Sequence, residues 1–279
     1  MEYFTLNNGI KMPMAGIGVF MLTPDQAEAS IESALKGGVR LIDTANAYMN
    51  ESATGRGIKK SGVAREDIFL VTKLWPTVYG KETAVDETLA RLQTDYIDLL
   101  FLHQPTDNWK EGYKNIEKAV KEGKVKAIGL SNFDNETLEE AIEWAQIKPQ
   151  VVQVEAHPYF PQTELKAILA KTGMGIMAWY PLGHGDKTLI ERPVFAELGA
   201  KYGKSNAQII LRWHIQSGNV VIPGSKNPDH IRDNFDIFDF EFTDDEMKKI
   251  AELDNGVRYY QGNPELLKQY ASMELGPDL

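Results

Sequence analysis

The sequence predicts an α/β fold of the (β/α)₈ or TIM-barrel type, and three observations favour this class. Eight short apolar runs alternate with longer amphipathic segments along the 279 residues. Most of these runs are continuously apolar, which is typical of parallel strands buried on both faces. The chain length is close to the ~250 residues of such a barrel. No linker-like tract interrupts the pattern, so we expect one domain spanning residues 1–279.

The expected elements begin with a hairpin and continue as alternating strands and helices. The stretch YFTLNNGIKMP predicts a β-hairpin that turns at Asn8-Gly9. Strands are then expected at 14–18, 39–43, 68–73, 97–103, 125–131, 151–156, 175–179 and 220–224. Residues 23–38 carry clear helix signals, with Thr23 as N-cap and Pro24 at the first helical position.

Further helices are expected where similar signals recur. Caps and apolar spacing predict helices at 134–146 and 205–218. Residues 50–62 form a weaker helix prediction, because Gly55 and Gly57 are poor helix formers. A doubly wound sheet is the alternative architecture, but no G-x-G-x-x-G motif follows the first strand.

The composition excludes several classes of partner and site. A net charge of −10 argues against nucleic acid or an anionic membrane as the main partner. The absence of cysteine excludes disulfides, thiol catalysis and cysteine-ligated zinc. The N-terminus lacks the pattern of a signal peptide, and no apolar stretch approaches the ~20 residues of a membrane span. We therefore expect a cytoplasmic protein that acts on a small molecule.

Ionisable residues follow three consecutive strands at equal spacing. Asp43, Lys73 and His103 close the second, third and fourth strands and are 30 residues apart. Because the chemistry of such barrels lies at the carboxyl ends of the strands, the three side chains are expected at one rim. Tyr48 lies just beyond Asp43 and can reach the same place.

Each of these side chains also has an ordinary structural explanation. Asp43 alone is typical of a cap or turn, and Lys73 alone of a solvated strand end. His103 alone is typical of a partly buried histidine, and Tyr48 of surface packing. The repeated spacing of the set favours a functional site over these separate explanations.

The chemistry that suits the set is proton transfer by tyrosine. A phenol has a pKa near ~10, and a neighbouring lysine favours the phenolate and lowers that pKa. Asp43 would hold Lys73 charged, and His103 could donate a hydrogen bond to a substrate oxygen. Such an acid could protonate a carbonyl oxygen, but no residue can supply the hydride. A nicotinamide cofactor is therefore implied.

Several motifs together resemble the aldo-keto reductases over nearly the whole chain. They are DTANAYMNE, TKLW, GLSNF, VVQVEAHP and the IP-S and DN pairs within IPGSKNPDHIRDN, and they occur in the family order. The pattern is similar to small bacterial members that resemble diketogluconate reductase. The resemblance implies a barrel whose N-terminal hairpin closes the bottom, a monomer, and a catalytic tetrad of Asp43, Tyr48, Lys73 and His103. Tyr48 would be the acid in reduction and the base in oxidation.

The resemblance also implies a set of cofactor-binding residues. Ser131, Asn132 and Gln153 match positions that hold the nicotinamide carboxamide. Trp179 matches an aromatic that stacks on the nicotinamide, although barrel packing explains it equally well. Tyr180 stands where many members have serine. The remaining positions implied are Leu182, Gly183, Gly224, Ser225, Lys226 and His230, with Asp233 and Asn234 on the adenine side.

Two departures from the family pattern bear on cofactor choice. Members that prefer NADPH commonly have lysine and arginine where this chain has Gly224 and His230. Histidine is mostly neutral at pH 7 and lacks the planar fork of arginine. Lys226 could restore one cation. We therefore expect NADP(H) to be favoured narrowly, with NAD(H) also used.

An apolar substrate pocket is expected beside Tyr48 and His103. Phe20, Trp75 and Trp109 are its candidate walls, with the segment from about residue 256 as a flexible wall. Gln104 replaces a common tryptophan after the histidine, so one wall differs from that of relatives.

We therefore expect an NAD(P)H-dependent carbonyl reductase that acts on aldehydes and ketones, and two other functions compete with this interpretation. A metal-dependent hydrolase would need clustered ligands, but the five histidines form no H-x-H or H-E-x-x-H pattern, so no metal site is expected. A cofactor-binding protein with little turnover would keep the same fold. A turnover assay separates that alternative from an enzyme.

Overall fold

Eight parallel strands form a barrel in the computed structural model, which describes residues 1–278. The strands are β3 (Ile17–Gly18), β4 (Leu41–Asp43), β5 (Phe69–Leu74), β6 (Leu99–Leu102), β7 (Ile128–Ser131), β8 (Val151–Glu155), β9 (Gly175–Trp179) and β10 (Asn219–Val221). Each strand pairs in parallel with the next along the chain. A bridge between Ala15 and Val221 joins the two ends of the sheet, with Gly16 N donating to Val221 O at 2.8 Å. The predicted (β/α)₈ barrel is confirmed.

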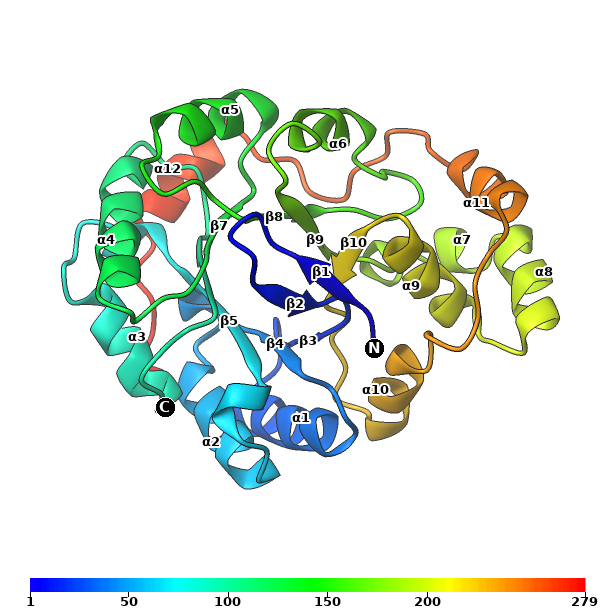
Figure 1. The fold of residues 1–279 in the computed structure, drawn as a ribbon, viewed down its shortest axis with the longest axis horizontal. Helices are drawn as coiled ribbons and strands as arrows, with labels where there is room; N and C mark the ends of the chain where they lie inside the picture. Colours follow the sequence, from blue (N-terminus) through cyan, green and yellow to red (C-terminus); the bar gives the residue numbers. More distant parts are fainter. Residues whose placement is uncertain (279) are drawn as a thin grey trace.

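The predicted N-terminal hairpin is also present and covers one end of the barrel (Figure 1). It consists of β1 (Tyr3–Thr5) and β2 (Lys11–Pro13), which are antiparallel, and Gly9 in the turn has a φ of +87°. Leu6 and Met12 are buried in the core inside the barrel. The side chain of Asn7 donates to Pro149 O at 3.0 Å, next to the start of β8. The hairpin therefore closes the end at which the strands begin.

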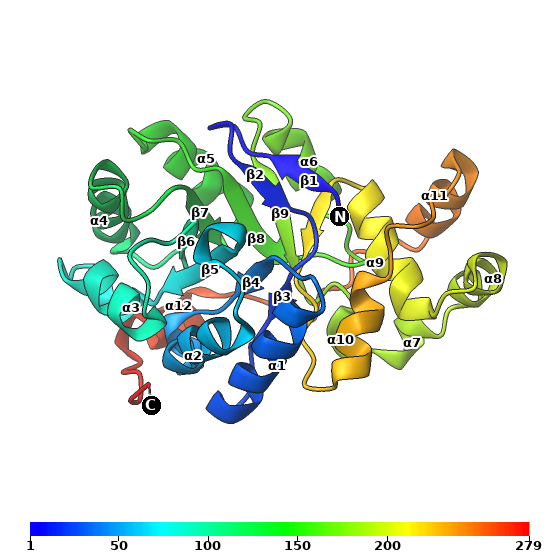
Figure 2. The ribbon, with the colours of Figure 1, turned by 60° about the horizontal axis from the view of Figure 1, so that its bottom comes forward.

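Helices surround the barrel and connect the strands (Figures 1 and 2). They are α1 (Pro24–Lys36), α2 (Glu51–Ser61), α3 (Ala84–Leu92), α4 (Trp109–Lys121), α5 (Asn135–Trp144), α6 (Thr163–Leu169), α7 (Lys187–Ile190), α8 (Pro193–Tyr202), α9 (Asn206–Gln216), α10 (Pro228–Phe235), α11 (Asp244–Ala251) and α12 (Pro264–Ser272). Short 3₁₀ turns are η1 (Asn46–Tyr48), η2 (Arg65–Asp67), η3 (Pro76–Val78) and η4 (Gly183–Gly185). Thr23, Asp134 and Ser205 accept backbone N–H groups as N-caps of α1, α5 and α9, as their sequence signals predict. Within residues 1–278, no helix combines the length and apolar character needed to cross a membrane.

The glycines of α2 allow close packing against both neighbouring helices. A Cβ atom at Gly55 would lie 2.5 Å from Leu92 O at the end of α3. A Cβ atom at Gly57 would lie 2.7 Å from Glu28 O in α1. The segment forms a helix although its sequence predicts one only weakly, because tertiary packing outweighs the poor helix propensity of glycine.

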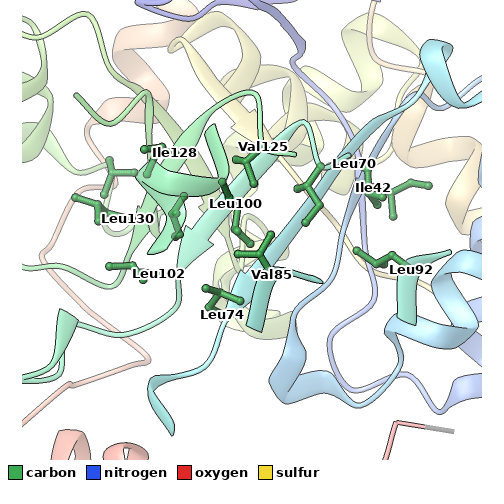
Figure 3. Packing of buried hydrophobic residues seen from close by; sticks show 14 of the residues in the cluster. Ile42, Leu70, Leu74, Val85, Leu92, Leu100, Leu102, Val125, Ile128 and Leu130 are labelled. Atoms are coloured by element: carbon green, nitrogen blue, oxygen red, sulfur yellow. The ribbon is translucent and has the colours of Figure 1, made fainter. Parts of the chain in front are cut away.

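Alternation along the strands divides the apolar side chains into two layers. One layer fills the barrel interior and includes Leu41, Phe69, Val71, Leu99, Phe101, Val151 and Met177. The other lies between strands and helices and includes Ile42, Leu70, Leu100 and Ile128, with Val85 and Leu92 of α3 (Figure 3). Because both faces of each strand are buried, the runs read as continuously apolar in the sequence.

Candidate active site

The barrel interior changes from apolar to polar toward the carboxyl ends of the strands. Side chains two residues apart on a strand point to the same face. Asp43 therefore points into the barrel like Leu41, and Lys73 points into it like Val71. In the sheet, Asp43 lies beside Val71, and Lys73 lies beside Phe101. Each polar residue is therefore two positions further along its strand than the neighbour of the polar residue on the strand before it. Strand tilt in a closed barrel accompanies such a stagger. The polar side chains consequently converge at the end opposite the hairpin.

Lys73 is the hub of the polar cluster. Its side chain is fully buried, and its Nζ atom lies 2.7 Å from Asp43 Oδ2. The same atom donates to Thr44 O at 2.8 Å and to the hydroxyl oxygen of Tyr48 at 3.2 Å. The structure thus brings together the aspartate, lysine and tyrosine expected from their spacing.

The loop that carries Tyr48 is held by buried hydrogen bonds. Tyr48 ends η1, and the following Met49 adopts the left-handed conformation with a φ of 53°. Asn46, at the start of η1, donates to Glu51 Oε2 at 3.0 Å and to Thr88 Oγ1 at 3.1 Å. These contacts fix the position of the tyrosine relative to α2 and α3.

His103 approaches Tyr48 from the next strand. It directly follows β6, and its backbone N–H donates to Leu74 O at 3.1 Å. Its ring meets the rings of Tyr48 and Trp75 edge-on, with centroid distances of 5.7 Å and 5.0 Å. Among the buried atoms of residues 1–278, Nδ1 of His103 is one of the few without a hydrogen-bond partner.

Burial controls the protonation of these four groups. It raises the pKa of Asp43 and lowers the pKa of Lys73, and the ion pair between them opposes both shifts. Burial, the charge of Asp43 and the nearby Tyr180 raise the pKa of Tyr48 well above its ordinary value. Burial and the charge of Lys73 lower the pKa of His103 well below its ordinary value, so its ring is neutral at pH 7.

The expected lowering of the Tyr48 pKa is wrong, because burial outweighs the effect of Lys73 and the net shift is upward. The phenol is buried, and removing a phenolate from water costs more than one neighbouring ammonium group returns. Tyr48 consequently keeps its proton at neutral pH.

A cavity of about 750 Å³ opens above the cluster. Seven of the expected cofactor residues line it, namely Ser131, Asn132, Gln153, Trp179, Tyr180, Leu182 and Gly224, together with Phe20, Trp75 and His103 of the expected pocket. Gly183 is buried beside it with a φ of +60°, where a Cβ atom would lie 2.5 Å from Leu189. The other expected cofactor residues lie outside the cavity, in the loop after β10 and in α10; they are Ser225, Lys226, His230, Asp233 and Asn234.

Trp109 does not belong to this cavity. It begins α4, is 5% exposed, and packs among the rings of Tyr113, Phe133 and Trp144 at centroid distances of 6.4, 5.9 and 5.3 Å. The pocket expectation for this tryptophan fails because α4 turns its first residue toward the outer core.

The polar side chains on β7 and β8 are held in fixed orientations. Ser131 and Gln153 are direct neighbours in the register of the two strands. Gln153 Nε2 donates to Asp43 Oδ1 at 2.9 Å. Asn132, with a φ of 62°, accepts from Trp179 Nε1 at 3.0 Å and donates to His103 O at 3.3 Å. The three side chains offer both donors and acceptors, a set that fits a carboxamide.

The segment from about residue 256 lines the cavity, as expected, although the sequence analysis named none of its individual residues. Tyr259, Tyr260, Tyr270 and Met273 all line the cavity. The backbone N–H groups of Tyr259 and Tyr260 donate to the carboxylate of Glu155 at 2.6 and 3.0 Å. Glu155 could have been found, because it follows Gln153 by two residues and therefore shares its inward direction.

A hydrogen bond at the cavity lining joins two segments that are distant in the sequence. The Tyr259 hydroxyl donates to Asp186 Oδ2 at 2.7 Å, joining the C-terminal segment to the loop after β9. Within residues 1–278, the cavity included, no group of three or more His, Asp or Glu side chains is arranged to hold a metal ion.

Comparisons with known proteins agree with this geometry. A model described as the Aldo/keto reductase family matches residues 15–255. The chain is 44% identical over 267 residues to glyoxal reductase of Bacillus subtilis, covering 94% of this chain and 96% of that protein. It is 43% identical over 270 residues to morphine 6-dehydrogenase of Pseudomonas putida, covering 91% of each. The structure of Bombyx mori aldo-keto reductase in complex with NADP has a TM-score of 0.87 at 30% identity, covering 93% of this chain and 95% of that chain. The chain therefore belongs to the aldo/keto reductase family of oxidoreductases.

Proposed function

We propose that the cavity is the active site of an NAD(P)H-dependent carbonyl reductase that converts aldehydes and ketones to alcohols. The hub at Lys73 carries this proposal, because its ammonium group contacts both the Asp43 carboxylate and the Tyr48 hydroxyl. A buried lysine is costly unless it is paired. Here it is paired on one side and faces a phenol on the other, where it can stabilise the phenolate that forms as Tyr48 gives up its proton.

Each residue of the cluster has a distinct role in reduction. The raised pKa of Tyr48 keeps its proton available until a carbonyl oxygen accepts it. The neutral ring of His103 donates a hydrogen bond to the same oxygen and orients it. Asp43 holds Lys73 in position, and in oxidation the Tyr48 phenolate is the base. A bound nicotinamide cofactor would supply the hydride that these residues cannot.

The cofactor residues are proposed from the cavity lining and the loop after β10. Ser131, Asn132 and Gln153 would hold the carboxamide, and the half-buried Trp179 would stack on the nicotinamide ring. The loop after β9, with Tyr180, Leu182 and Gly183, would lie along the middle of the cofactor. At the far end, Gly224, Ser225, Lys226, His230, Asp233 and Asn234 would lie near the adenosine part. The complex of the Bombyx mori relative with NADP supports this class of cofactor.

The substrate wall beside Tyr48 is largely apolar. Phe20 contacts the Tyr48 ring at a centroid distance of 5.0 Å, and Tyr270 contacts Trp75 at 5.0 Å. Met273 also lines the cavity. We therefore propose carbonyl compounds with an apolar or aromatic group as good substrates, in addition to small dicarbonyls of the kind named for the Bacillus relative.

A turnover assay with a Tyr48→Phe variant tests the proposal. A panel of dicarbonyls, aromatic aldehydes, cyclic ketones and keto-sugars is followed by cofactor absorbance, and the variant is expected to lose ~10²–10⁴-fold in turnover. Its affinity for the reduced cofactor, measured by fluorescence, should stay within twofold of the wild type. Tyr3→Phe is the matched control, because Tyr3 lies in the hairpin at the opposite end and is 53% exposed.

Near wild-type turnover by Tyr48→Phe would refute the assignment of the acid. Tight cofactor binding by the wild type without turnover on any member of the panel would instead favour a cofactor-binding protein of the same fold.

A further inference from the structure

The side chain of Asp278 is largely buried, although most of the tail around it is exposed. The side chain of Asp278 is 7% exposed, whereas Glu274, Gly276 and Pro277 are exposed. Its two carboxylate oxygens accept from Glu51 N at 2.9 Å and from Ser52 N at 3.1 Å, at the N-terminus of α2. The Nε atom of Arg91 lies 3.7 Å away. A carboxylate this buried is stable only because these partners replace its water.

The N-terminus of α2 lacks a cap of its own. Asn50 occupies the N-cap position but makes no capping hydrogen bond with its side chain. Its amide instead donates to Val19 O at 3.0 Å and accepts from Thr44 Oγ1 at 2.8 Å. The first N–H groups of α2 are therefore left for Asp278, and the positive end of the helix dipole favours a carboxylate there.

The residues before Asp278 form a strap across the mouth of the cavity. We define the C-terminal strap as residues 256–278, and it lies at the end of the barrel opposite the hairpin (Figures 1 and 2). Glu155 pins one end of the strap through the backbone of Tyr259 and Tyr260. Asp278 pins the other end, 226 residues from Ser52 along the chain.

The middle of the strap has little packing of its own. None of the residues of α12, all of which the structure describes, is buried. Tyr270 nevertheless reaches the cavity and stacks edge-on against Trp75 at 5.0 Å, and Met273 follows it into the lining. Near the tail, Gly276 passes so close to the residue after Tyr48 that a Cβ atom would lie 3.0 Å from Met49 Sδ. The position of this wall therefore depends on its two pinned ends.

We propose that Asp278 is a positioning residue for substrate binding. Its carboxylate latches the C-terminal strap onto α2 and thereby holds Tyr270 and Met273 against the substrate pocket. This inference rests on the proposed carbonyl reductase function of the cavity. Asp278 does not contact the reacting atoms in this proposal. The latch should therefore affect the binding of substrates that reach Tyr270 and Met273, and it should leave the chemical step unchanged.

The test compares Asp278→Ala with Glu274→Ala, which removes an exposed acid of the same tail. Hydrogen exchange should rise at least tenfold at the amides of Glu51 and Ser52 and in residues 264–272 of Asp278→Ala. With a biphenyl aldehyde, long enough to reach Tyr270, KM should rise about fivefold while kcat stays within twofold. With glyoxal, too small to reach the wall, both constants should stay within twofold. Glu274→Ala should behave as the wild type in every measurement.

Three outcomes would overturn the latch. Unchanged exchange at Glu51 and Ser52 would mean that the carboxylate does not dock there in solution. Faster exchange in α2 alone, with α12 and both KM values unchanged, would reduce Asp278 to a helix cap. Equal effects of Asp278→Ala and Glu274→Ala would point to general loosening of the tail. If the wild type turns over no carbonyl compound, the proposed function fails, and exchange in α12 still decides whether the strap is latched.

Discussion

In the proposed mechanism, Tyr48 has to keep its proton in the resting site and release it beside a carbonyl oxygen. Burial provides the first property, because it raises the pKa of the phenol. Lys73 provides the second, because its ammonium group lies 3.2 Å from the oxygen on which negative charge develops. The neutral His103 adds a donor without a second positive charge that would compete with Lys73. The same burial thus sets the protonation state of each partner.

We expect cofactor choice also to depend on single residues. Replacing Gly224 with the lysine common in NADPH-preferring members would cause a clash, because a Cβ atom there would lie 2.9 Å from Gly18 O. His230 is exposed in α10 and is the better position to change. On the same helix, Arg232 is already paired with Asp229 at 2.9 Å and with Asp233 at 3.3 Å. A cation at position 230 would therefore add to Lys226 at the proposed phosphate end.

We predict that the wild type uses both cofactors and favours NADPH only narrowly. The imidazole of His230 lacks the planar fork with which arginine binds a phosphate through two hydrogen bonds. His230→Arg should therefore raise the ratio of kcat/KM for NADPH to that for NADH by about two- to fivefold, on the order expected for one exposed charge. A large preference for either cofactor in the wild type, or an unchanged ratio in His230→Arg, would contradict the role given to position 230.

Among helices, strands and turns, the sequence predicts the features that depend on local residue patterns. It misses the features that depend on contacts between segments distant in the chain. The apolar runs, the caps at Thr23 and Asp134 and the hairpin turn are local signals, and the structure has the elements they predict. Helix α2 and the placement of Trp109 depend on neighbouring helices, which no local window contains. The role of the tail is hidden for the same reason, because Asp278 meets residues more than 200 positions away.

The glycines of α2 lead to a prediction that reverses helix propensity. Alanine normally stabilises a helix by ~1 kcal/mol relative to glycine. At Gly55, however, the new Cβ atom would meet the backbone of Leu92 at 2.5 Å, and overpacking against backbone costs ~1–3 kcal/mol. Gly55→Ala should therefore fail to stabilise the protein and should lower the free energy of unfolding by up to about 2 kcal/mol in urea titrations. Ser52→Ala on the same helix is the control and should be neutral; stabilisation by Gly55→Ala would show that α2 and α3 are less tightly packed.

Across the whole molecule, the two ends of the barrel have different tasks. The hairpin end is sealed by apolar side chains such as Leu6 and Met12. The opposite end buries ionisable groups and is covered by the strap. Buried ionisable groups make the stability of a fold depend on pH, since the folded and unfolded chains bind different numbers of protons.

His214 gives the clearest case of this dependence outside the site. It is fully buried in α9, where its Nε2 atom donates to Pro181 O at 3.0 Å and Nδ1 accepts from Asn219 at 3.1 Å. Because Pro181 O can only accept, Nε2 carries the proton and the ring is satisfied while neutral. Burial lowers the pKa of His214 to about 3.

This shift predicts a loss of stability in acid with a definite sign. The folded pKa of about 3 lies below the ~6.5 of an unfolded histidine, so between these values only the unfolded chain binds the proton. The stabilisation that neutral His214 provides is complete above pH ~6.5 and falls by up to ~1.4 kcal/mol per pH unit below it. The unfolding free energies of the wild type and His214→Gln, measured in urea at pH 7, 6 and 5, should therefore converge as pH falls. Because every other titrating group is common to both proteins, a constant difference between them would mean that His214 is protonated in the folded chain.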